Sequence, residues 1–305
     1  MVAEGRGYDR PMVDGGFSLT LDDGRVLEAW RGAADGTSAV LFHVGTPSAG
    51  IAYEPMVVEA AGRGLGLVTY SRPGYGASTR QPGRSVAACA ADVATLAERL
   101  ELERLYVVGW SGGGPHALAC AALLPGLVAS AATLAGVAPY AAEGLDWLDG
   151  MAEENRDEFG AAIEGTAALQ GFLEQAADDV RGRQGSTVAD ALGGLVTEVD
   201  RRALSGPLAD YLALLNREAV TQGIWGWYDD DLAFSRDWAF RLDDVTVPVT
   251  VWQGRQDAMV PYAHGEWLAR HVPGARAMLL EDEGHLSLVL RFGEVVEQLL
   301  ADAAR

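Results

Sequence analysis

The sequence predicts an α/β fold, with a mostly parallel eight-stranded sheet, helices on both faces and a helical insertion after the sixth strand. Short apolar runs typical of buried strands alternate with stretches of helical period, and such alternation requires crossover connections between parallel strands. The alternation stops at about residue 139 and resumes after residue 238. The composition, 49% hydrophobic and 22% charged, is that of a globular protein.

The first half of the chain predicts a hairpin followed by alternating strands and helices. Asp22-Asp23-Gly24 separates two apolar runs, which is a strong hairpin signal. The later apolar runs are continuous, as in strands covered on both faces, and segments of helical period separate them. We expect strands at residues 17–21, 26–30, 39–44, 67–70, 105–109 and 130–136, and helices at 54–63, 85–100 and 115–124.

The second half predicts the insertion and the end of the sheet. Residues 139–238 show helical stretches without a clear strand, so we expect them to form a helical cap, or lid. Residues 1–138 and 239–305 then form the core domain. Two further strands are expected at 249–253 and 276–280, a helix between them at 262–271, and an amphipathic helix at about 288–301.

The charge limits the partners. The net charge is −20 and all 23 basic residues are arginine, so the chain as a whole repels nucleic acid and anionic membranes. Residues 141–240 carry 20 acidic and 7 basic side chains, which indicates either solvated helix faces or an acidic rim that disfavours anionic substrates. We therefore expect a small-molecule substrate, and a homodimer is left open.

Location and cofactors follow from what the sequence lacks. No apolar run reaches the roughly 18 residues that span a bilayer. Residues 1–16 are polar, without the apolar core of a signal peptide, so a soluble cytoplasmic protein is expected. Cys89 and Cys120 lie in Ala-rich helical segments and are expected as buried free thiols. No paired ligand spacing suggests a metal, and no cofactor is expected.

A serine between glycines follows the fifth strand. Residues 109–113, Gly-Trp-Ser-Gly-Gly, fit G-x-S-x-G between a predicted strand and a predicted helix. A sharp turn there needs small residues two places before and after Ser111, and it exposes the hydroxyl at a helix N-terminus. Such a serine is a candidate nucleophile. The alternative from this motif alone is a Gly-rich turn of a nucleotide-binding fold.

A serine nucleophile needs a base and an acid that orients the base. His285 follows the last strand and Asp257 follows the strand before it, so both emerge at the sheet edge where Ser111 emerges. Asp257 is favoured over Asp146 and over the run 281–283, which is expected to be exposed. The remaining histidines are less suitable: His116 is expected to pack against the sheet, whereas His264 and His271 lie in a polar helix and are expected to be solvated.

Five segments together resemble the serine-type α/β-hydrolase fold family with a helical cap, in its esterase and proline iminopeptidase-like branch. These are FHVGTPSAG, SRPGYGAS, GWSGGGPHAL, GRQDAMVP and EGHLSL, in this order along nearly the whole chain. The resemblance implies an acyl-enzyme mechanism on Ser111, His285 and Asp257. It also implies an oxyanion hole formed by the backbone N–H groups of Gly112 and Thr46, with Gly45 permitting close approach.

Two positions depart from the family pattern. Val44 stands where the oxyanion loop usually has a histidine, and His43 lies one place earlier. Ser71 stands where the loop after the fourth strand usually begins with aspartate. The serine nucleophile argues against the aspartyl-ester chemistry of haloalkane dehalogenases and epoxide hydrolases.

The substrate is expected to be a small hydrophobic or aromatic ester, lactone or amide. We expect an aromatic, weakly charged pocket that Gly45 lines and in which Trp110 and Gly112 flank the nucleophile. Trp225 and Trp227 are expected to contribute from the cap, with packing in the core of the cap as the alternative for each. The alternatives are a proline iminopeptidase-like aminopeptidase, with Glu153 or Glu154 holding an ammonium group, and a cofactor-free lyase, carbon–carbon hydrolase or perhydrolase. A silent ligand-binding protein and a scaffold that docks a partner are the non-enzyme alternatives.

Overall fold

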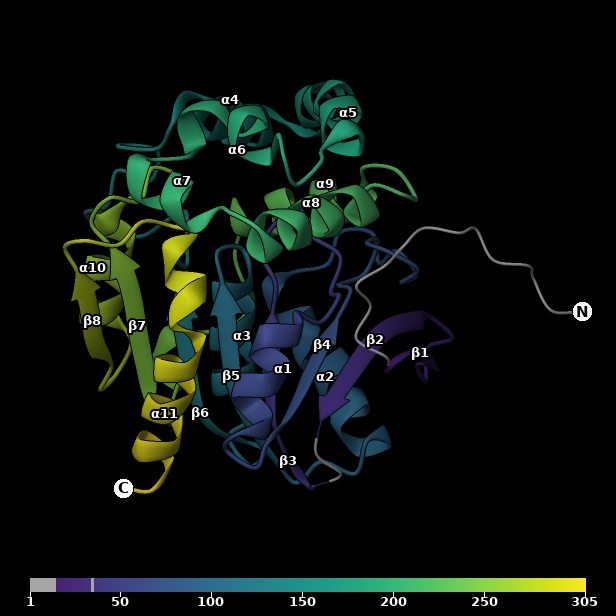
Figure 1. Ribbon diagram of the computed structural model, residues 1–305, viewed down its shortest axis with the longest axis vertical. Helices are drawn as coiled ribbons and strands as arrows, with labels where there is room; N and C mark the ends of the chain where they lie inside the picture. Colours follow the sequence, from purple (N-terminus) through teal and green to yellow (C-terminus); the bar gives the residue numbers. More distant parts are fainter. Residues whose placement is uncertain (1–14, 34–35) are drawn as a thin grey trace, which may run out of the picture.

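The computed structural model describes residues 15–33 and 36–305. The segment 1–14, on which most of the signal-peptide argument rests, lies outside them. One eight-stranded sheet runs in the order β1-β2-β4-β3-β5-β6-β7-β8 (Figure 1). The pairs β1–β2 and β2–β4 are antiparallel, and every other neighbouring pair is parallel. The predicted fold class is confirmed.

All eight expected strands are present with small differences at their ends. The antiparallel hairpin forms around the expected Asp-Gly turn, with Gly16 opposite Trp30 and Thr20 opposite Val26. The strands are β1 (Gly16–Thr20), β2 (Val26–Ala33), β3 (Ser38–His43), β4 (Gly66–Tyr70), β5 (Arg104–Trp110), β6 (Val128–Leu134), β7 (Val249–Gly254) and β8 (Arg276–Leu280).

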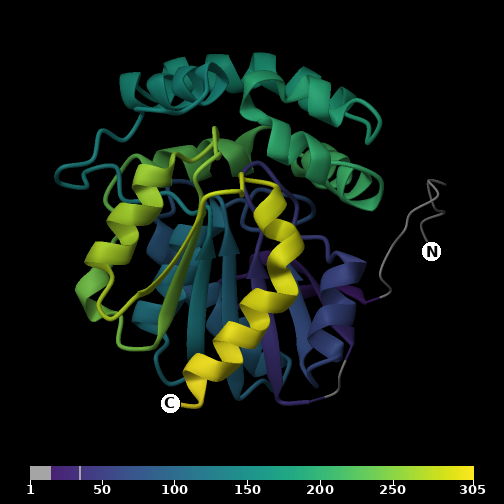
Figure 2. The ribbon, with the colours of Figure 1, turned by 60° about the vertical axis from the view of Figure 1, so that its left-hand side comes forward.

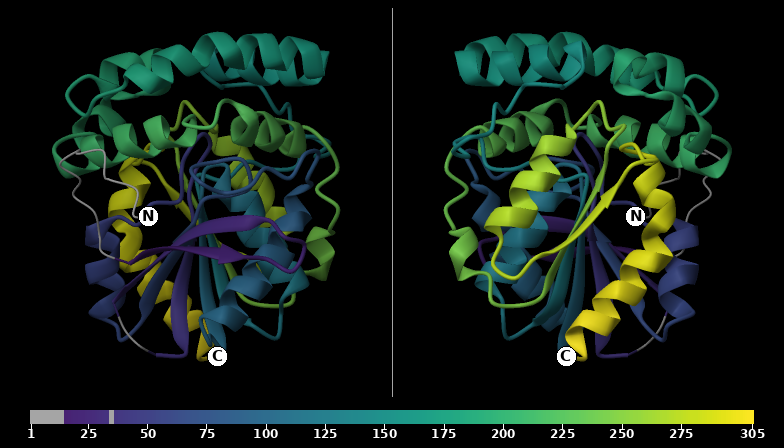
Figure 3. Two further views of the ribbon diagram at one scale, coloured as in Figure 1. Left: turned by 90° about the vertical axis from the view of Figure 1, so that its right-hand side faces the viewer. Right: turned by 90° about the vertical axis from the view of Figure 1, so that its left-hand side faces the viewer.

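Five helices cover the two faces of the sheet, which Figure 3 shows edge-on between them. Helices α1 (Glu54–Ala61) and α11 (Phe292–Ala303) pack on one face. Helices α2 (Cys89–Arg99), α3 (Gly113–Leu123) and α10 (Tyr262–His271) pack on the other. Several ends differ from the prediction. Helix α3 begins two residues earlier than expected and α1 ends two residues earlier. Helices α2 and α11 begin later, at Cys89 and Phe292, because a 3-10 turn precedes each of them.

Helix α3 lies in the middle of the fold, and its small residues explain how it fits there. Every residue from Gly113 to Ala122 is buried. A Cβ at Gly114 would lie 2.8 Å from the Cα of Gly136, so the helix approaches the end of β6 at backbone contact. The Ala- and Gly-rich sequence therefore brings the N-terminus of α3 directly over the carboxyl end of the parallel strands.

The segment between β6 and β7 is helical, and it lies over the carboxyl edge of the sheet (Figures 1 and 2). All residues of 139–238 are described, and no strand is among them. No helix in the described part of the chain is long and apolar enough to cross a membrane. The helices are α4 (Glu153–Glu164), α5 (Thr166–Gly182), α6 (Val188–Ala191), α7 (Glu198–Ala203), α8 (Pro207–Ala219) and α9 (Trp225–Phe234).

Helix α8 is attached to the loop that follows β3. The Tyr211 hydroxyl donates to the carbonyl of Ile51 at 2.8 Å, and the Asn216 amide donates to the carbonyl of Pro47 at 2.8 Å. The N–H of Ala49 donates to the carbonyl of Leu215 at 3.1 Å. These contacts fix the inserted helices against a loop that borders the candidate active site.

Candidate active site

The turn between β5 and α3 holds Ser111 in a strained conformation. Its φ is +54°, in the left-handed region that non-glycine residues rarely adopt. A Cβ at Gly109 would collide with the carbonyl of Gly113, and one at Gly113 would collide with the carbonyl of His43. Glycine is therefore required on both sides of the turn, and the serine is presented at the N-terminus of α3.

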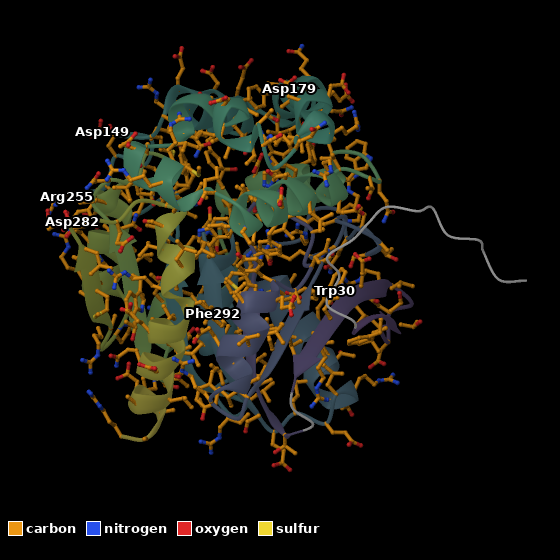
Figure 4. The ribbon with its side chains drawn as sticks, in the orientation of Figure 1. Trp30, Asp149, Asp179, Arg255, Asp282 and Phe292 are labelled. Carbon is orange, nitrogen blue, oxygen red and sulfur yellow. The ribbon has the colours of Figure 1, made fainter. Side chains whose placement is uncertain are left out.

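His285 and Asp257 are hydrogen-bonded to each other. His285 Nδ1 lies 2.9 Å from Asp257 Oδ2, and the other carboxylate oxygen accepts the N–H groups of Met259 at 2.9 Å and Val260 at 2.8 Å. His285 and Ser111 border the same cavity. The rival acids lie elsewhere, since Asp146 is exposed and Asp282 lies on the outer edge of the molecule (Figure 4).

The environment of His285 favours its protonated form despite burial. Burial lowers the pKa of the imidazole, but the charge and hydrogen bond of Asp257 and the charge of Asp200 outweigh it, so the pKa is raised. An imidazolium that forms when His285 accepts a proton is thereby stabilised. This is the property that a general base for a serine hydroxyl needs.

Two backbone N–H groups flank the serine from opposite sides. A Cβ at Gly112 would collide with the Thr46 hydroxyl, so the loop after β3 lies in contact with the start of α3. Among the described hydrogen bonds, none engages the N–H of Gly112 or of Thr46. Both are therefore free to donate to an oxyanion.

Arg72 supports the loop that carries Thr46. Its guanidinium donates to the carbonyls of Val44 at 2.6 Å and Gly45 at 2.9 Å and to the Thr46 hydroxyl at 2.9 Å. An arginine from the loop after β4 thus holds the backbone at Val44, the position that departs from the family pattern. Sequence reasoning did not find this role, although Arg72 lies within the SRPG segment.

Asp230 of α9 neutralises Arg72. The carboxylate is fully buried, and it lies 2.7 Å from Arg72 Nη2 and 2.6 Å from Arg84 Nη1. It also accepts the hydroxyls of Thr46 at 2.8 Å and Tyr75 at 2.9 Å. Burial raises the pKa of Asp230, but the two arginines outweigh this and lower it well below its usual range. The inserted helices thus supply a charge on which the loop of Thr46 depends.

The second departure, Ser71, also has a structural role. Its hydroxyl donates to Glu28 Oε2 at 2.9 Å and accepts the N–H of Gly50 at 2.9 Å. Ser71 therefore connects β2 with the loop after β3. The hydroxyl satisfies a buried donor and a carboxylate at once.

The other histidines are structural in their contacts, and one prediction about them is wrong. His116 is buried, its Nδ1 lies 2.8 Å from the carbonyl of Gly112, and burial lowers its pKa to about 3. His264 was expected to be solvated, but it is fully buried, with Nε2 2.9 Å from the carbonyl of Trp147. The start of the insertion covers His264, which a local pattern could not reveal. His271 is exposed, as expected, and stacks on Trp267.

A cavity of about 330 Å³ opens in front of Ser111, between the sheet edge and the inserted helices. Trp110, Gly45 and Gly112 line it, as expected, and so does Trp227. Trp225 is outside the lining and stacks against Arg80, with 4.1 Å between the guanidinium and the ring, so its expected place in the pocket is wrong. Phe234, one of the aromatic residues of the insertion, also lines the cavity, and so do two rings that sequence reasoning missed, Phe159 and Phe172.

The side of the cavity formed by the inserted helices is acidic, which corrects the expectation of a weakly charged pocket. Four carboxyl groups border it, together with Arg183. Burial raises the pKa of Glu158 to about 7, although Trp227 Nε1 donates to its carboxylate at 2.7 Å. Burial and the neighbouring charge of Glu158 also raise the pKa of Asp231. The four are Glu154, Asp157, Glu158 and Asp179.

Comparison with known proteins identifies the family. The sequence profile described as "alpha/beta hydrolase fold" matches residues 38–292. A non-heme chloroperoxidase of Streptomyces lividans is 30% identical over 253 residues, which cover 81% of this chain and 84% of the relative. A pimeloyl-[acyl-carrier protein] methyl ester esterase of Aromatoleum aromaticum is 31% identical over 231 residues, covering 73% and 81%.

Solved structures agree in fold. A hydrolase from Pseudomonas aeruginosa PA01 superposes with a TM-score of 0.68 at 19% identity and covers 94% of this chain and 98% of its own. A bromoperoxidase from Bacillus anthracis superposes with a TM-score of 0.67 at 22% identity and covers 94% and 100%. At these identities the likeness concerns the fold alone.

Proposed function

The chain belongs to the α/β-hydrolase fold family and is a hydrolase, and we propose that it is a serine esterase acting through an acyl-enzyme. One observation carries the proposal: the strained Ser111 borders the same cavity as a His285 that is hydrogen-bonded to Asp257. A serine at a helix N-terminus, a base with a raised pKa and a buried acid are the parts that acyl transfer requires.

The mechanism follows from these positions. His285 Nε2 accepts the Ser111 proton while the hydroxyl oxygen bonds to the carbonyl carbon of the ester, and Asp257 keeps the proton on Nδ1. The N–H groups of Gly112 and Thr46 hold the resulting oxyanion. The imidazolium then gives its proton to the departing alcohol, which leaves an acyl-Ser111. Water repeats the sequence with His285 as base, and the carboxylic acid is released.

The cavity supports a small substrate with an apolar acyl or alcohol part. Its volume of about 330 Å³ is at the lower end of the range of ligand pockets. Aromatic rings from both the sheet edge and the inserted helices line the cavity, and the carboxyl groups come from the inserted helices α4 and α5. We therefore propose a neutral or cationic small ester rather than an anionic one.

Perhydrolysis is the second candidate, because the similar Streptomyces lividans protein carries the name non-heme chloroperoxidase. On the same triad, hydrogen peroxide would replace water in the second half-reaction. The acyl–Ser111 bond would break as the peroxide oxygen bonds to the acyl carbon, and a peroxycarboxylic acid would leave. His285 would take the peroxide proton and return it to Ser111.

We also propose a domain division, a location and a class of partner for this enzyme. Residues 139–238 would form the cap domain, with 1–138 and 239–305 as the core domain. The protein would work in the cytoplasm on a small molecule, without nucleic acid, a membrane or a cofactor as partner. The acidic net charge of −20 supports the exclusion of nucleic acid.

The test is a burst assay with p-nitrophenyl acetate and butyrate, in parallel with Ser111→Ala. We expect a burst of one nitrophenolate per active site in the wild type, followed by turnover, and neither phase in the variant. A fluorophosphonate should add its mass to the peptide that contains Ser111. Turnover that survives in Ser111→Ala would refute the proposed nucleophile. Adding hydrogen peroxide and measuring peracid distinguishes perhydrolysis from hydrolysis.

A further inference from the structure

A second buried carboxylate from the inserted helices meets the loop of His285. Asp200 lies in the short helix α7 and is fully buried. Its Oδ2 accepts the N–H of His285 at 3.0 Å, and its Oδ1 accepts those of Leu286 at 2.7 Å and Ser287 at 3.0 Å. Three consecutive backbone donors of one loop thus converge on one side chain. The mechanism above does not use this carboxylate.

The site is built for a carboxylate. Burying a charge is unfavourable unless hydrogen bonds or an opposite charge compensate it. In the described part of the chain, Asp200 forms no ion pair, so the backbone N–H groups and the Thr197 hydroxyl, at 3.3 Å, provide the compensation. A Cβ at Gly284 would lie 2.5 Å from both carboxylate oxygens. Glycine at position 284 therefore allows the carboxylate to reach the loop.

We propose that Asp200 is a positioning residue for the catalytic base, an inference that rests on the proposed function. By holding the backbone of residues 285–287, it fixes the loop from which the imidazole reaches Asp257. Other hydrogen bonds also hold the loop: Trp110 Nε1 donates to the carbonyl of His285 at 3.2 Å, and the N–H of Gln256 donates to the carbonyl of Glu283 at 2.9 Å. Within the loop, the N–H of Gly284 donates to the Ser287 hydroxyl at 2.9 Å. Asp200 differs from these groups because it brings a charge from the inserted helices.

The charge of Asp200 also acts on the imidazole. Two carboxylates act on His285: Asp257, after β7, by its charge and a hydrogen bond, and Asp200, from α7, by its charge. Glu283, on the same loop, pairs with Arg291 at 2.6 Å, and Arg291 also pairs with Glu294 at 2.8 Å. Removing the charge of Asp200 should therefore lower the pKa of His285. If Asp200 had only a structural role, the same substitution would leave this pKa unchanged.

The experiment compares Asp200→Asn with Asp190→Asn in the full-length protein. Asp190 lies on α6, also in the insertion, and its exposed side chain pairs with Arg201 on the surface. For Asp200→Asn we expect kcat on p-nitrophenyl acetate to fall about 10- to 100-fold, since small misplacements of a catalytic group have effects of this size. KM should change by less than about twofold, because the substrate contacts remain. Asp190→Asn should match the wild type.

The pKa of His285 is the decisive readout. Measured by NMR titration of the imidazole, it should fall by about half a unit to one unit in Asp200→Asn. An unchanged pKa and an unchanged kcat would overturn the proposal, and so would a loss of kcat that merely follows the fraction of unfolded protein. The NMR titration needs no turnover. It therefore tests the position of the base even if the enzyme proves not to be an esterase.

Hydrogen exchange on the wild type covers the case in which Asp200→Asn does not fold. We expect the amides of residues 285–287 to exchange far more slowly than the amide of the exposed Asp282 on the same loop. Equal exchange rates for these amides would overturn the proposal, because the carboxylate would then not hold the loop in solution.

Discussion

Replacing Asp230 by asparagine should destabilise the protein strongly, because two buried guanidiniums lose their anion. The side chains of Arg72 and Arg84 are 1% and 3% exposed, and both pair with Asp230, which is 0% exposed. Asparagine keeps the shape and one acceptor but removes the charge. Arg72 retains the carbonyls of Val44 and Gly45, whereas Arg84 retains only the carbonyl of Gly226, at 3.1 Å.

The magnitude follows from the burial of the pair. Removing one partner of a buried ion pair costs about 3–5 kcal/mol of the free energy of unfolding, since the other charge stays buried and uncompensated. In urea, with a slope of about 3 kcal/mol per M, this loss lowers the unfolding midpoint by about 1–1.7 M. Equilibrium unfolding followed by fluorescence at pH 7 measures the shift.

The neighbouring Asp229→Asn is the matched control. Asp229 lies on the same helix and pairs with Arg80 at 2.7 Å, but the Arg80 side chain is 29% exposed and can turn to water. We expect this substitution to cost about 1 kcal/mol or less. If Asp230→Asn unfolds no more easily than Asp229→Asn, the buried network does not hold the fold, and the account of the loop of Thr46 fails with it.

The pH dependence gives an independent test of the same charge. The folded-state pKa of Asp230 is depressed, so its contribution to stability is complete above the unfolded value of 3.8 and is lost as the pH falls through the folded value. The difference in unfolding free energy between wild type and Asp230→Asn should therefore be fully developed at pH 5. It should shrink below about pH 4.

Four further predictions concern the pocket and the triad. Burial raises the pKa of Glu158 from 4.5 to about 7, so ionisation of this carboxyl destabilises the folded protein as the pH rises through that range. Glu158→Gln should therefore raise the free energy of unfolding at pH 8 but not at pH 4. Because the pKa of His285 is raised and catalysis needs the neutral imidazole, kcat/KM should rise with pH through a midpoint above about 6.5. Asp257→Asn should lower kcat by about 10⁴-fold. Gly112→Ala, whose Cβ would collide with Thr46, should lower kcat at least about 100-fold, whereas Gly126→Ala, with no atom within 4 Å of its Cβ, should leave kcat unchanged.

The strands of the sheet and the candidate residues that follow them could be predicted from the sequence. Periodicity is local, so the order of strands and helices could be predicted, and parallel strands bring their carboxyl ends to one edge. Ser111, Asp257 and His285 each follow a strand directly, and the structure brings the last two within 2.9 Å. The glycines around the serine could be interpreted because the turn excludes side chains on purely local grounds.

The residues that sequence reasoning missed depend on how the insertion docks. Asp230 lies 158 positions from Arg72, and Asp200 lies 85 positions from His285. In the sequence, both acids look like ordinary surface carboxylates, because helical periodicity does not say what a polar residue will meet. The same reason explains His264, which the start of the insertion covers, and Trp225, which stacks on an arginine instead of facing the cavity.

These two acids change what the insertion does in the molecule. A lid that only covers a pocket would leave the core with an intact active centre. Here Arg72 holds the loop of Val44 and Thr46, and the charge of the buried Arg72 is balanced by Asp230 from α9. The loop of His285 receives three hydrogen bonds from Asp200 of α7. Because carboxylates of the insertion hold both the loop of Thr46 and the loop of His285, our proposal makes the docked insertion a condition of the active-site geometry and not only a cover for the substrate.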